Sequence, residues 1–158
     1  MGVVVRRAEV RDLEAVQEVG RLTWPPTYAF AGEAYIVHGL ETWWSRDAIE
    51  RGMRDTTMLV AVDDDRVVGV ANIDFRGDVP VIWKLYVVPE SQGTGAGSAL
   101  MSSLVELAAP SADAVRLEYV DGNDRAERFY ARHGFAELRR EPGEQPGWPD
   151  IVWAERPV

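Results

Sequence analysis

The chain has 158 residues, a length that suits one folded domain with a proper core. It has no cysteine, which excludes disulfides, thiolate nucleophiles and cysteine-ligated metal sites, and its two histidines, His38 and His133, form no metal-binding pattern. The net charge of −9, without a long run of Lys or Arg, disfavours a nucleic-acid partner. No apolar run approaches the about 20 residues of a membrane span, and the N-terminus lacks the features of a signal peptide. We therefore expect a cytoplasmic protein without a metal or a membrane contact.

The hydrophobic periodicity and the turn residues predict a mixed α/β chain. Trp24-Pro25-Pro26 should end the first helix, and the segment 27–40, in which aromatic and apolar residues are mixed with two glycines, predicts no clear element. The order β-α-α-β-β-β-α-β-α-β-β shows neither repeats nor a linker, so 1–158 should be a single domain. In chain order the predicted elements are a strand at 3–8, helices at 9–21 and 41–53, strands at 56–62, 67–75 and 79–88, a helix at 98–109, a strand at 115–120, a helix at 124–132, and strands at 135–140 and 151–154.

The stretch from Leu85 to Gly97, Leu-Tyr-Val-Val-Pro-Glu-Ser-Gln-Gly-Thr-Gly-Ala-Gly, predicts a strand, a glycine-rich turn and the start of a helix. Leu100, Leu104 and Leu107 give that helix one apolar stripe. Such a turn presents free N–H groups at the positive end of the helix dipole, an arrangement that suits phosphate. The glycine spacing fits no dinucleotide fingerprint, and the lysine of a P-loop is absent. A glycine-rich connection without a ligand is the alternative interpretation.

The residues Gln-Gly-x-Gly-x-Gly at 92–97 resemble the pyrophosphate-binding turn of the GCN5-related N-acetyltransferase (GNAT) superfamily, Gln/Arg-x-x-Gly-x-Gly/Ala. The preceding Leu-Tyr-Val-x-Pro at 85–89 also resembles that family. A second segment, Asn123 to Phe135, is similar to the family's Asn-x-x-Ala-x-x-Phe-Tyr-x-x-x-Gly-Phe. The two motifs stand in the family's order and together cover roughly 81–135.

The resemblance implies a mixed α+β fold of the α/β class, with a mostly antiparallel twisted central sheet, a splay between strands 4 and 5, and helices on both faces. It implies transfer of an acyl group, usually acetyl, from acyl-CoA to a primary amine of a small molecule or a peptide, by direct attack in a ternary complex. The co-substrate would be acetyl-CoA, with no metal and with a homodimer left open. A coenzyme A-binding sensor or scaffold without catalysis on the same fold is the competing interpretation.

The resemblance also implies site residues. N–H groups between Gly93 and Ser98 would hold the pyrophosphate, and the edge of the strand at 85–87 would pair with the pantetheine arm and polarise the thioester carbonyl. Tyr130 would be the catalytic residue, because a phenol with a pKa of about 10 stays protonated and can donate to the leaving thiolate. The expected coenzyme-binding residues are Leu85, Tyr86, Val87, Gln92, Gly93, Thr94, Gly95, Ala96, Gly97, Ser98 and Asn123.

The general base stays open. Many family members place a glutamate about four residues before this Leu-Tyr-Val, where this chain has Val81, with Lys84 beside the motif. Glu118, Asp74 or an ordered water are the remaining candidates. The aromatic residues of 23–40, the region that shapes the acceptor pocket in the family, suggest an amphipathic amine, although core packing explains them equally well.

Three side chains of the second motif have ordinary structural explanations. Phe129 is expected in the core, Asp124 as the cap of the helix at 124–132, and His133 as a charge at its C-terminal end.

Overall fold

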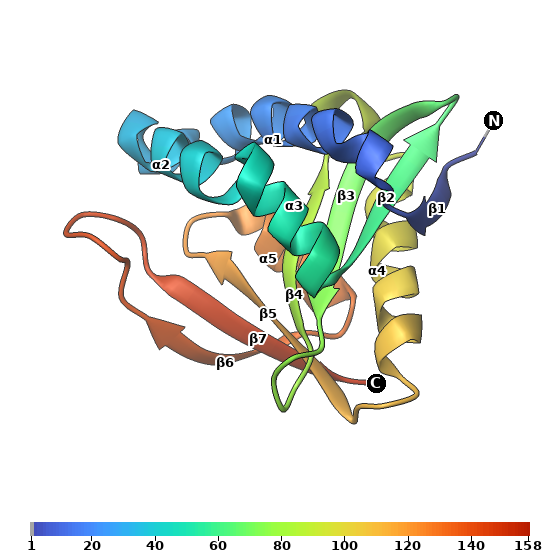
Figure 1. Ribbon diagram of the computed structural model, residues 1–158. Coiled ribbons are helices and arrows are strands. Elements are labelled where there is room, and N and C mark those ends of the chain that lie inside the picture. The colour runs from blue at the N-terminus through green and yellow to red at the C-terminus, as the bar shows by residue number, and fades with distance from the viewer. Residues whose placement is uncertain (1) are drawn as a thin grey trace.

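A seven-stranded sheet forms the centre of the computed structural model, which describes residues 2–158 (Figure 1). The strands lie side by side in the order β1-β2-β3-β4-β5-β7-β6, and every neighbouring pair is antiparallel except β4 and β5. The predicted mostly antiparallel sheet is therefore confirmed. The strands are β1 (Val4–Arg7), β2 (Thr57–Asp63), β3 (Arg66–Asp74), β4 (Val81–Val87), β5 (Ala114–Val120), β6 (Ala136–Glu141) and β7 (Ile151–Pro157).

Helices cover both faces of the sheet, as predicted (Figure 1). The first three helices cover one face, and α4 packs on the other, where Leu100 and Leu104 are fully buried. The predicted stripe continues into Ala108 rather than Leu107, which is 40% exposed. None of the helices in the described chain has the length and apolar character that a bilayer span requires. The helices are α1 (Leu13–Thr27), α2 (Glu33–Trp43), α3 (Arg46–Asp55), α4 (Ala96–Ala108) and α5 (Asp124–Arg132).

The first helix differs from its prediction at both ends. It begins at Leu13, after a 3-10 turn, and continues through Pro25 and Pro26 to Thr27. The prolines lie in its last turn, where the two hydrogen bonds that they remove would have ended on carbonyls of the exposed residues Arg21 and Leu22. Water can satisfy those carbonyls, so the expectation that the prolines end the helix was wrong.

Most of α2 lies in the segment 27–40, which predicted no element, and the helix expected at 41–53 covers the end of α2 and most of α3. Ser45 separates them, because its hydroxyl accepts a hydrogen bond from the N–H of Ala48 and caps α3. Position 39, within α2, holds a glycine because a Cβ there would overlap the ring of Trp24. The chain therefore has three helices, and not two, between β1 and β2.

The feature that positions the site is the junction of β4 and β5. These parallel strands pair only at their beginnings, where Val81 lies opposite Arg116 and Ile82 opposite Leu117. Beyond Ile82 the described strands form no further ladder pairs, so β4 keeps one open edge. This confirms the predicted splay between the fourth and fifth strands.

Candidate active site

The glycine-rich turn after β4 has the left-handed backbone that its sequence requires. Gly93 and Gly95 have φ values of 84° and 93°, and the space where each Cβ would lie is open. Gly95 is the N-cap of α4, whose first intrahelical hydrogen bond runs from the N–H of Ala99 to its carbonyl. The N–H groups of 96–98 thus have no partner within the helix. The helix begins two residues earlier than the predicted Ser98.

The open edge of β4 presents backbone donors. The N–H of Val88 donates to the carbonyl of Val68 on the β3 side. Because backbone groups alternate along a strand, the N–H groups of Leu85 and Val87 point the other way, toward the splay. Gln92 donates a hydrogen bond from its side chain to the carbonyl of Val87 at 3.0 Å, so this predicted coenzyme contact is turned toward the strand.

A groove of about 610 Å³ joins these features, and we call it the turn groove. The side chains of Thr94 and Ala96 do not line it: Thr94 bonds to the carbonyl of Ser91, and Ala96 is buried in the core. The predicted residues that the structure brings together along the turn groove are Leu85, Tyr86, Val87, Gln92, Gly93, Gly95, Gly97, Ser98, Asn123 and Tyr130.

Helix α5 forms the opposite wall of the turn groove. Asn123 is its N-cap, accepting a hydrogen bond from the N–H of Ala126 at 3.2 Å, so the expected cap Asp124 is instead the first helical residue. Three exposed arginines that the sequence reading missed, Arg125, Arg128 and Arg132, also line the groove. Their i, i+3, i+7 spacing, which places them on one helix face, was the available signal.

Two more residues of the second motif differ from expectation. Phe129 packs against the core but also lines the turn groove. His133 lies at the C-terminal end of α5 as predicted, with its Nε2 3.2 Å from the hydroxyl of Ser98. Burial and the nearby cations Arg132 and Arg156 lower the pKa of His133, so the expected positive charge is disfavoured.

Tyr130 is held by a cluster of aromatic rings. Its ring centroid lies 5.8 Å from that of Tyr119, 5.6 Å from that of Phe129 and 6.0 Å from that of Phe135. Burial raises the pKa of Tyr130 to about 12, because the phenolate is poorly solvated there. Its hydroxyl group therefore stays protonated at neutral pH.

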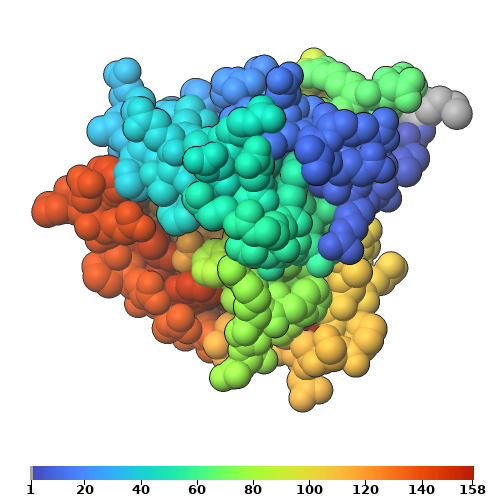
Figure 2. Space-filling view, viewed as in Figure 1, coloured from blue at the N-terminus to red at the C-terminus, as the bar shows by residue number. Residues whose placement is uncertain are grey.

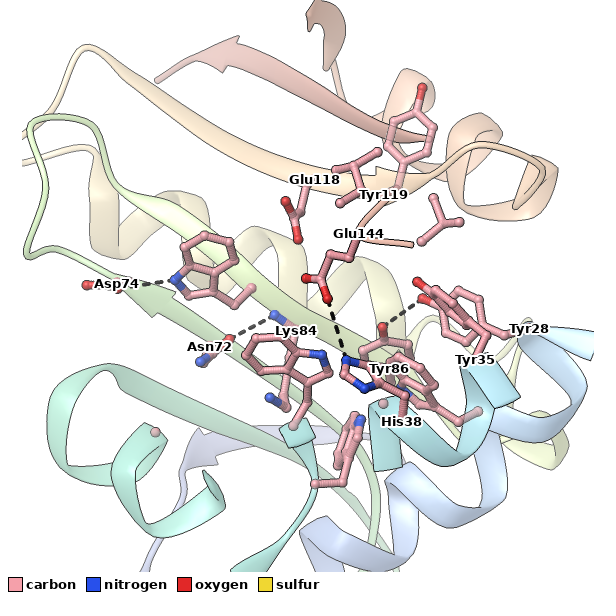
Figure 3. Close-up of a pocket in the computed structure, with 18 of the residues that line it drawn as sticks. Tyr28, Tyr35, His38, Asn72, Asp74, Lys84, Tyr86, Glu118, Tyr119 and Glu144 are labelled. Carbon is pink, nitrogen blue, oxygen red and sulfur yellow. Dashed lines mark hydrogen bonds and ion pairs between the residues drawn. The ribbon is translucent and has the colours of Figure 1, made fainter. Parts of the chain in front are cut away.

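A second cavity, of about 570 Å³, lies on the α1 side of β4, and we call it the aromatic cavity (Figure 3). Trp24 stacks on Tyr35 at 5.8 Å between ring centroids, and Trp148 meets the edge of Tyr35 at 5.2 Å. Figure 2 shows the surface hollowed where α2 and the loop between β6 and β7 approach each other. The aromatic residues lining the cavity are Trp24, Tyr28, Tyr35, Trp43, Trp44, Trp83, Tyr86, Tyr119 and Trp148.

The turn groove and the aromatic cavity meet at the splay. The hydroxyls of Tyr28 and Tyr86 lie 2.8 Å apart there, and burial raises the pKa of both phenols well above the usual value. A group bound on one side of β4 can therefore reach a group bound on the other. The residues that line both spaces are Tyr28, Trp83, Lys84, Tyr86, Glu118 and Tyr119.

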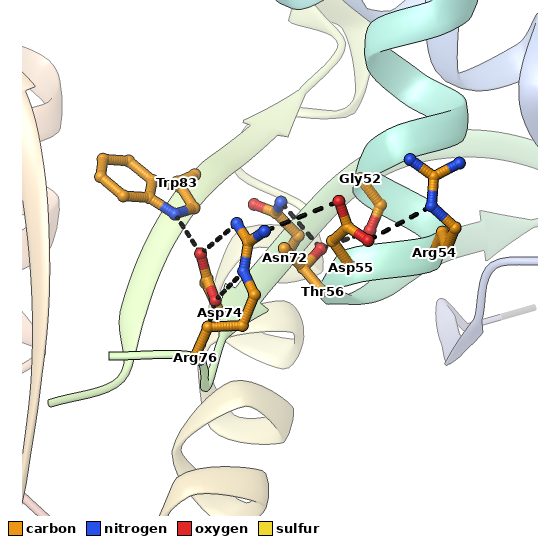
Figure 4. A network of polar contacts seen from close by, with 8 residues as sticks. All are labelled: Gly52, Arg54, Asp55, Thr56, Asn72, Asp74, Arg76 and Trp83. Atoms are coloured by element: carbon orange, nitrogen blue, oxygen red, sulfur yellow. Dashed lines mark hydrogen bonds and ion pairs between the residues drawn. The ribbon is translucent and has the colours of Figure 1, made fainter. Parts of the chain in front are cut away.

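The two candidate carboxylates differ in environment. Glu118, on β5, is partly buried and its carboxylate points into the cavity (Figure 3). Burial, with the charges of Glu141 and Glu144, raises the pKa of Glu118 to about 7. Asp74 instead accepts hydrogen bonds from Arg76 at 2.8 Å and Trp83 at 3.1 Å (Figure 4), which hold its pKa well below the usual value. Of the two carboxylates, Glu118 therefore has the pKa that suits a proton acceptor near neutral pH.

A bulge in β4 shapes the junction. Trp83 is the extra residue, because Asn72 of β3 lies opposite Lys84 and the next residue, Ile73, lies opposite Ile82. The buried side chain of Asn72 accepts a hydrogen bond from the N–H of Lys84 at 2.8 Å. Sequence reasoning missed Asn72, whose signal was a single amide within an apolar strand. Val81, the position where a glutamate was sought, lies in the paired part of β4 and lines neither space.

Comparisons with known proteins agree on one family. Residues 14–135 match the model of the Acetyltransferase (GNAT) family. Curated relatives from Mycobacterium bovis and Mycobacterium tuberculosis, each described as an uncharacterised N-acetyltransferase, are 43% identical over 81 residues. That match covers 49% of this chain and spans about half, 51%, of each relative.

Solved structures show the same fold. The PaiA N-acetyltransferase of Thermoplasma acidophilum in complex with coenzyme A superimposes with a TM-score of 0.85 at 22% identity, over 100% of both chains. The ribosomal-protein-S18-alanine N-acetyltransferase of Escherichia coli gives a TM-score of 0.79 at 18% identity, over 99% of this chain and 94% of that one. Since the family model matches most of its length, this chain belongs to the GNAT acetyltransferase family.

Proposed function

We propose that the protein is an acyl-CoA-dependent N-acyltransferase that transfers acetyl from acetyl-CoA to a primary amine by direct attack in a ternary complex. One observation carries the proposal: the turn groove and the aromatic cavity meet at the open edge of β4. Two substrates can then be held on opposite sides of one strand with their reacting groups in contact.

The turn groove suits coenzyme A. The N–H groups at the start of α4 and the arginines of α5 offer donors to the pyrophosphate and phosphate oxygens. The amides of the pantetheine arm can pair with the β4 edge as an added strand. The N–H groups of Leu85 and Val87 are then placed to stabilise the oxyanion that develops on the thioester carbonyl.

The chemistry needs a base and an acid. Glu118, with a pKa of about 7, takes a proton from the ammonium form of the acceptor, directly or through a water. The neutral amine attacks the thioester carbon, the C–S bond breaks, and the second amine proton is released to water as the amide forms. Tyr130, protonated at neutral pH, donates its proton to the sulfur as the thiolate leaves.

The acceptor that fits the aromatic cavity is an amphipathic amine with an apolar body. The rings of Trp24, Tyr35 and Trp148 provide the apolar surface, and the volume is that of a small-molecule site. The carboxylates of Glu118 and Glu144, both directed into the cavity, favour a cationic head (Figure 3).

Two measurements test the function. Acetyl-CoA at 100 times its Kd should stabilise the protein by about 2.7 kcal/mol, with no equal effect of NAD or ATP. Free thiol should then be released from acetyl-CoA in the presence of aryl-alkyl amines, and more slowly with polyamines. Tight binding of acetyl-CoA without thiol release across the amine panel would instead support the non-catalytic coenzyme A-binding protein.

A further inference from the structure

Lys84 is the one lysine of the 158 residues, and it lies at the junction of the turn groove and the aromatic cavity. All other basic side chains apart from the histidines are arginines. Arginine stays protonated and is not a nucleophile at neutral pH, whereas a lysine amine becomes one when it loses its proton.

The surroundings of Lys84 disfavour its charged form. Its Nζ lies over the ring of Trp44, 5.0 Å from the centroid; this cation–π contact favours the ammonium form, whereas burial of the amine disfavours it. Among the acids that line the aromatic cavity, Asp55 and Asp74 pair with Arg76 and Glu144 lies 3.5 Å from His38, which leaves Glu118 as the acid that can take the Lys84 proton. Burial lowers the pKa of Lys84 to about 8, so a substantial fraction of its amine is neutral in mildly alkaline solution.

The backbone around Lys84 is fixed. Its N–H bonds to the buried side chain of Asn72, and the preceding Trp83 forms the bulge of β4. The next residue, Leu85, supplies one of the edge N–H groups assigned above to the thioester. A nucleophilic side chain and an oxyanion donor therefore come from consecutive residues of one strand.

We propose that Lys84 is a site of self-acetylation: when no acceptor amine fills the aromatic cavity, its ε-amine takes the acetyl group of bound acetyl-CoA. The proposal rests on the proposed function, since it uses the same bound thioester. The Nζ–C bond forms as the C–S bond breaks. The amine proton passes to Glu118, the thiolate takes the proton of Tyr130, and the products are Nε-acetyl-lysine and coenzyme A.

The modification would act on the acceptor side of the site. An acetylated Lys84 carries no charge and is larger, so it fills part of the aromatic cavity. The acceptor amine and Lys84 then compete for one thioester, and a good acceptor should protect Lys84.

The test is incubation of the full chain with acetyl-CoA, without an amine, followed by intact mass measurement and peptide mapping. We expect one added acetyl group, mapped to Lys84 and separated by mapping from the terminal α-amine. An aryl-alkyl amine that releases thiol in the activity assay should slow this modification.

A matched control moves the lysine to the surface. Lys84→Arg keeps a cation at the junction, and Arg11→Lys in the same chain places the single lysine at a position whose side chain is 71% exposed. Wild-type Lys84 should be acetylated more than about tenfold faster than the lysine of this double variant, since proximity to a bound thioester raises the rate. The double variant should still bind acetyl-CoA and keep the wild-type circular dichroism spectrum.

The outcomes separate this inference from the proposed function. An unmodified Lys84 with amine-dependent thiol release overturns the inference and leaves the transferase function standing. Acetylation at the rate of the double variant also overturns it, because the reaction is then merely chemical. Acetyl-CoA binding with neither Lys84 acetylation nor thiol release overturns both. Lys84 acetylation without thiol release to any amine supports the inference and contradicts transfer to a free amine.

Discussion

The side-chain amide of Gln92 donates a hydrogen bond to the backbone carbonyl of Val87, at 3.0 Å. This contact ties the glycine-rich turn to the last residue of β4. The two backbone surfaces assigned to the pyrophosphate and to the pantetheine arm are thereby held together, which gives Gln92 a positioning role. Gln92 also lines the turn groove, so its contact with the coenzyme stays a prediction.

Gln92→Ala should weaken acetyl-CoA binding with little loss of stability. One neutral hydrogen bond contributes about 1 kcal/mol, which corresponds to a roughly fivefold rise in Kd by calorimetry. Gln92→Glu should lose more, because a carboxylate cannot donate to Val87 and repels the pyrophosphate. Glu90→Gln, at an exposed neighbour paired with Arg66, is the control and should bind as wild type. Wild-type affinity in both Gln92 variants would contradict the positioning role.

Gly95→Val should reduce acetyl-CoA affinity while the fold persists. The φ of 93° costs a residue with a Cβ about 1–2 kcal/mol, and the added side chain enters the open space in front of the α4 N-terminus. The control is Gly77→Val, in an exposed turn outside both spaces. Calorimetry that finds equal affinity in the two variants would refute the phosphate site.

Tyr130→Phe should lower kcat by about 10²–10⁴-fold, the usual contribution of a general acid. The ring and its packing stay, so the Kd of acetyl-CoA should change little. Tyr119→Phe removes a hydroxyl from the neighbouring ring, 5.8 Å away between centroids, and should stay within a few-fold of wild type. If Tyr130→Phe loses binding and turnover equally, Tyr130 is a structural contact with the coenzyme.

Glu118→Gln should make the enzyme slower and the fold more stable. The rate with an amine should rise with pH through about 7 in the wild type, as Glu118 becomes the carboxylate, and this limb should vanish in the variant. The folded pKa lies above the model-peptide value of 4.5, so the folded state binds more protons and wild-type stability falls as pH rises from 4.5 to about 7. At pH 8 the neutral glutamine should raise the unfolding free energy.

Asp74→Asn is the matched control for Glu118→Gln, and we expect it to change the free energy of unfolding in the opposite direction. The pKa of Asp74 is lower in the folded state than its ordinary value of 3.8. Its ionised carboxylate therefore stabilises the fold above pH 3.8, and this stabilisation is lost as the pH falls further. Denaturant unfolding at pH 8 should therefore show Asp74→Asn destabilised and Glu118→Gln stabilised. The same direction in both variants would contradict the assignment of Glu118 as a poorly solvated carboxylate.

The sequence predicted the sheet and the two motifs because both depend on local chemistry. The strands alternate or run apolar, and the glycine pattern at 93–97 demands a particular backbone, so each was legible without tertiary contacts. The splay came from the family resemblance alone, since nothing in either strand taken singly shows where a ladder stops.

The remaining features depend on neighbours distant in sequence. Pro25 and Pro26 are tolerated because the affected carbonyls belong to the exposed residues Arg21 and Leu22, and that exposure is a property of the packed helix. The sequence alone does not distinguish Asp74 from Glu118 as a candidate base. The structure does, because Arg76 and Trp83 donate hydrogen bonds to Asp74. The sequence places Lys84 beside a motif, but only the fold places it between two cavities.

The alternation of β4 divides the work of one strand between its backbone and its side chains. Lys84 and Tyr86 turn their side chains toward Trp44, whereas Leu85 and Val87 contribute backbone groups to the splay. Any residue except proline supplies a backbone N–H group. Substitutions at 84 and 86 can therefore change the surface that faces the acceptor amine, while the backbone groups that face the coenzyme stay the same. One scaffold can thus acquire new amine specificities without losing its coenzyme site.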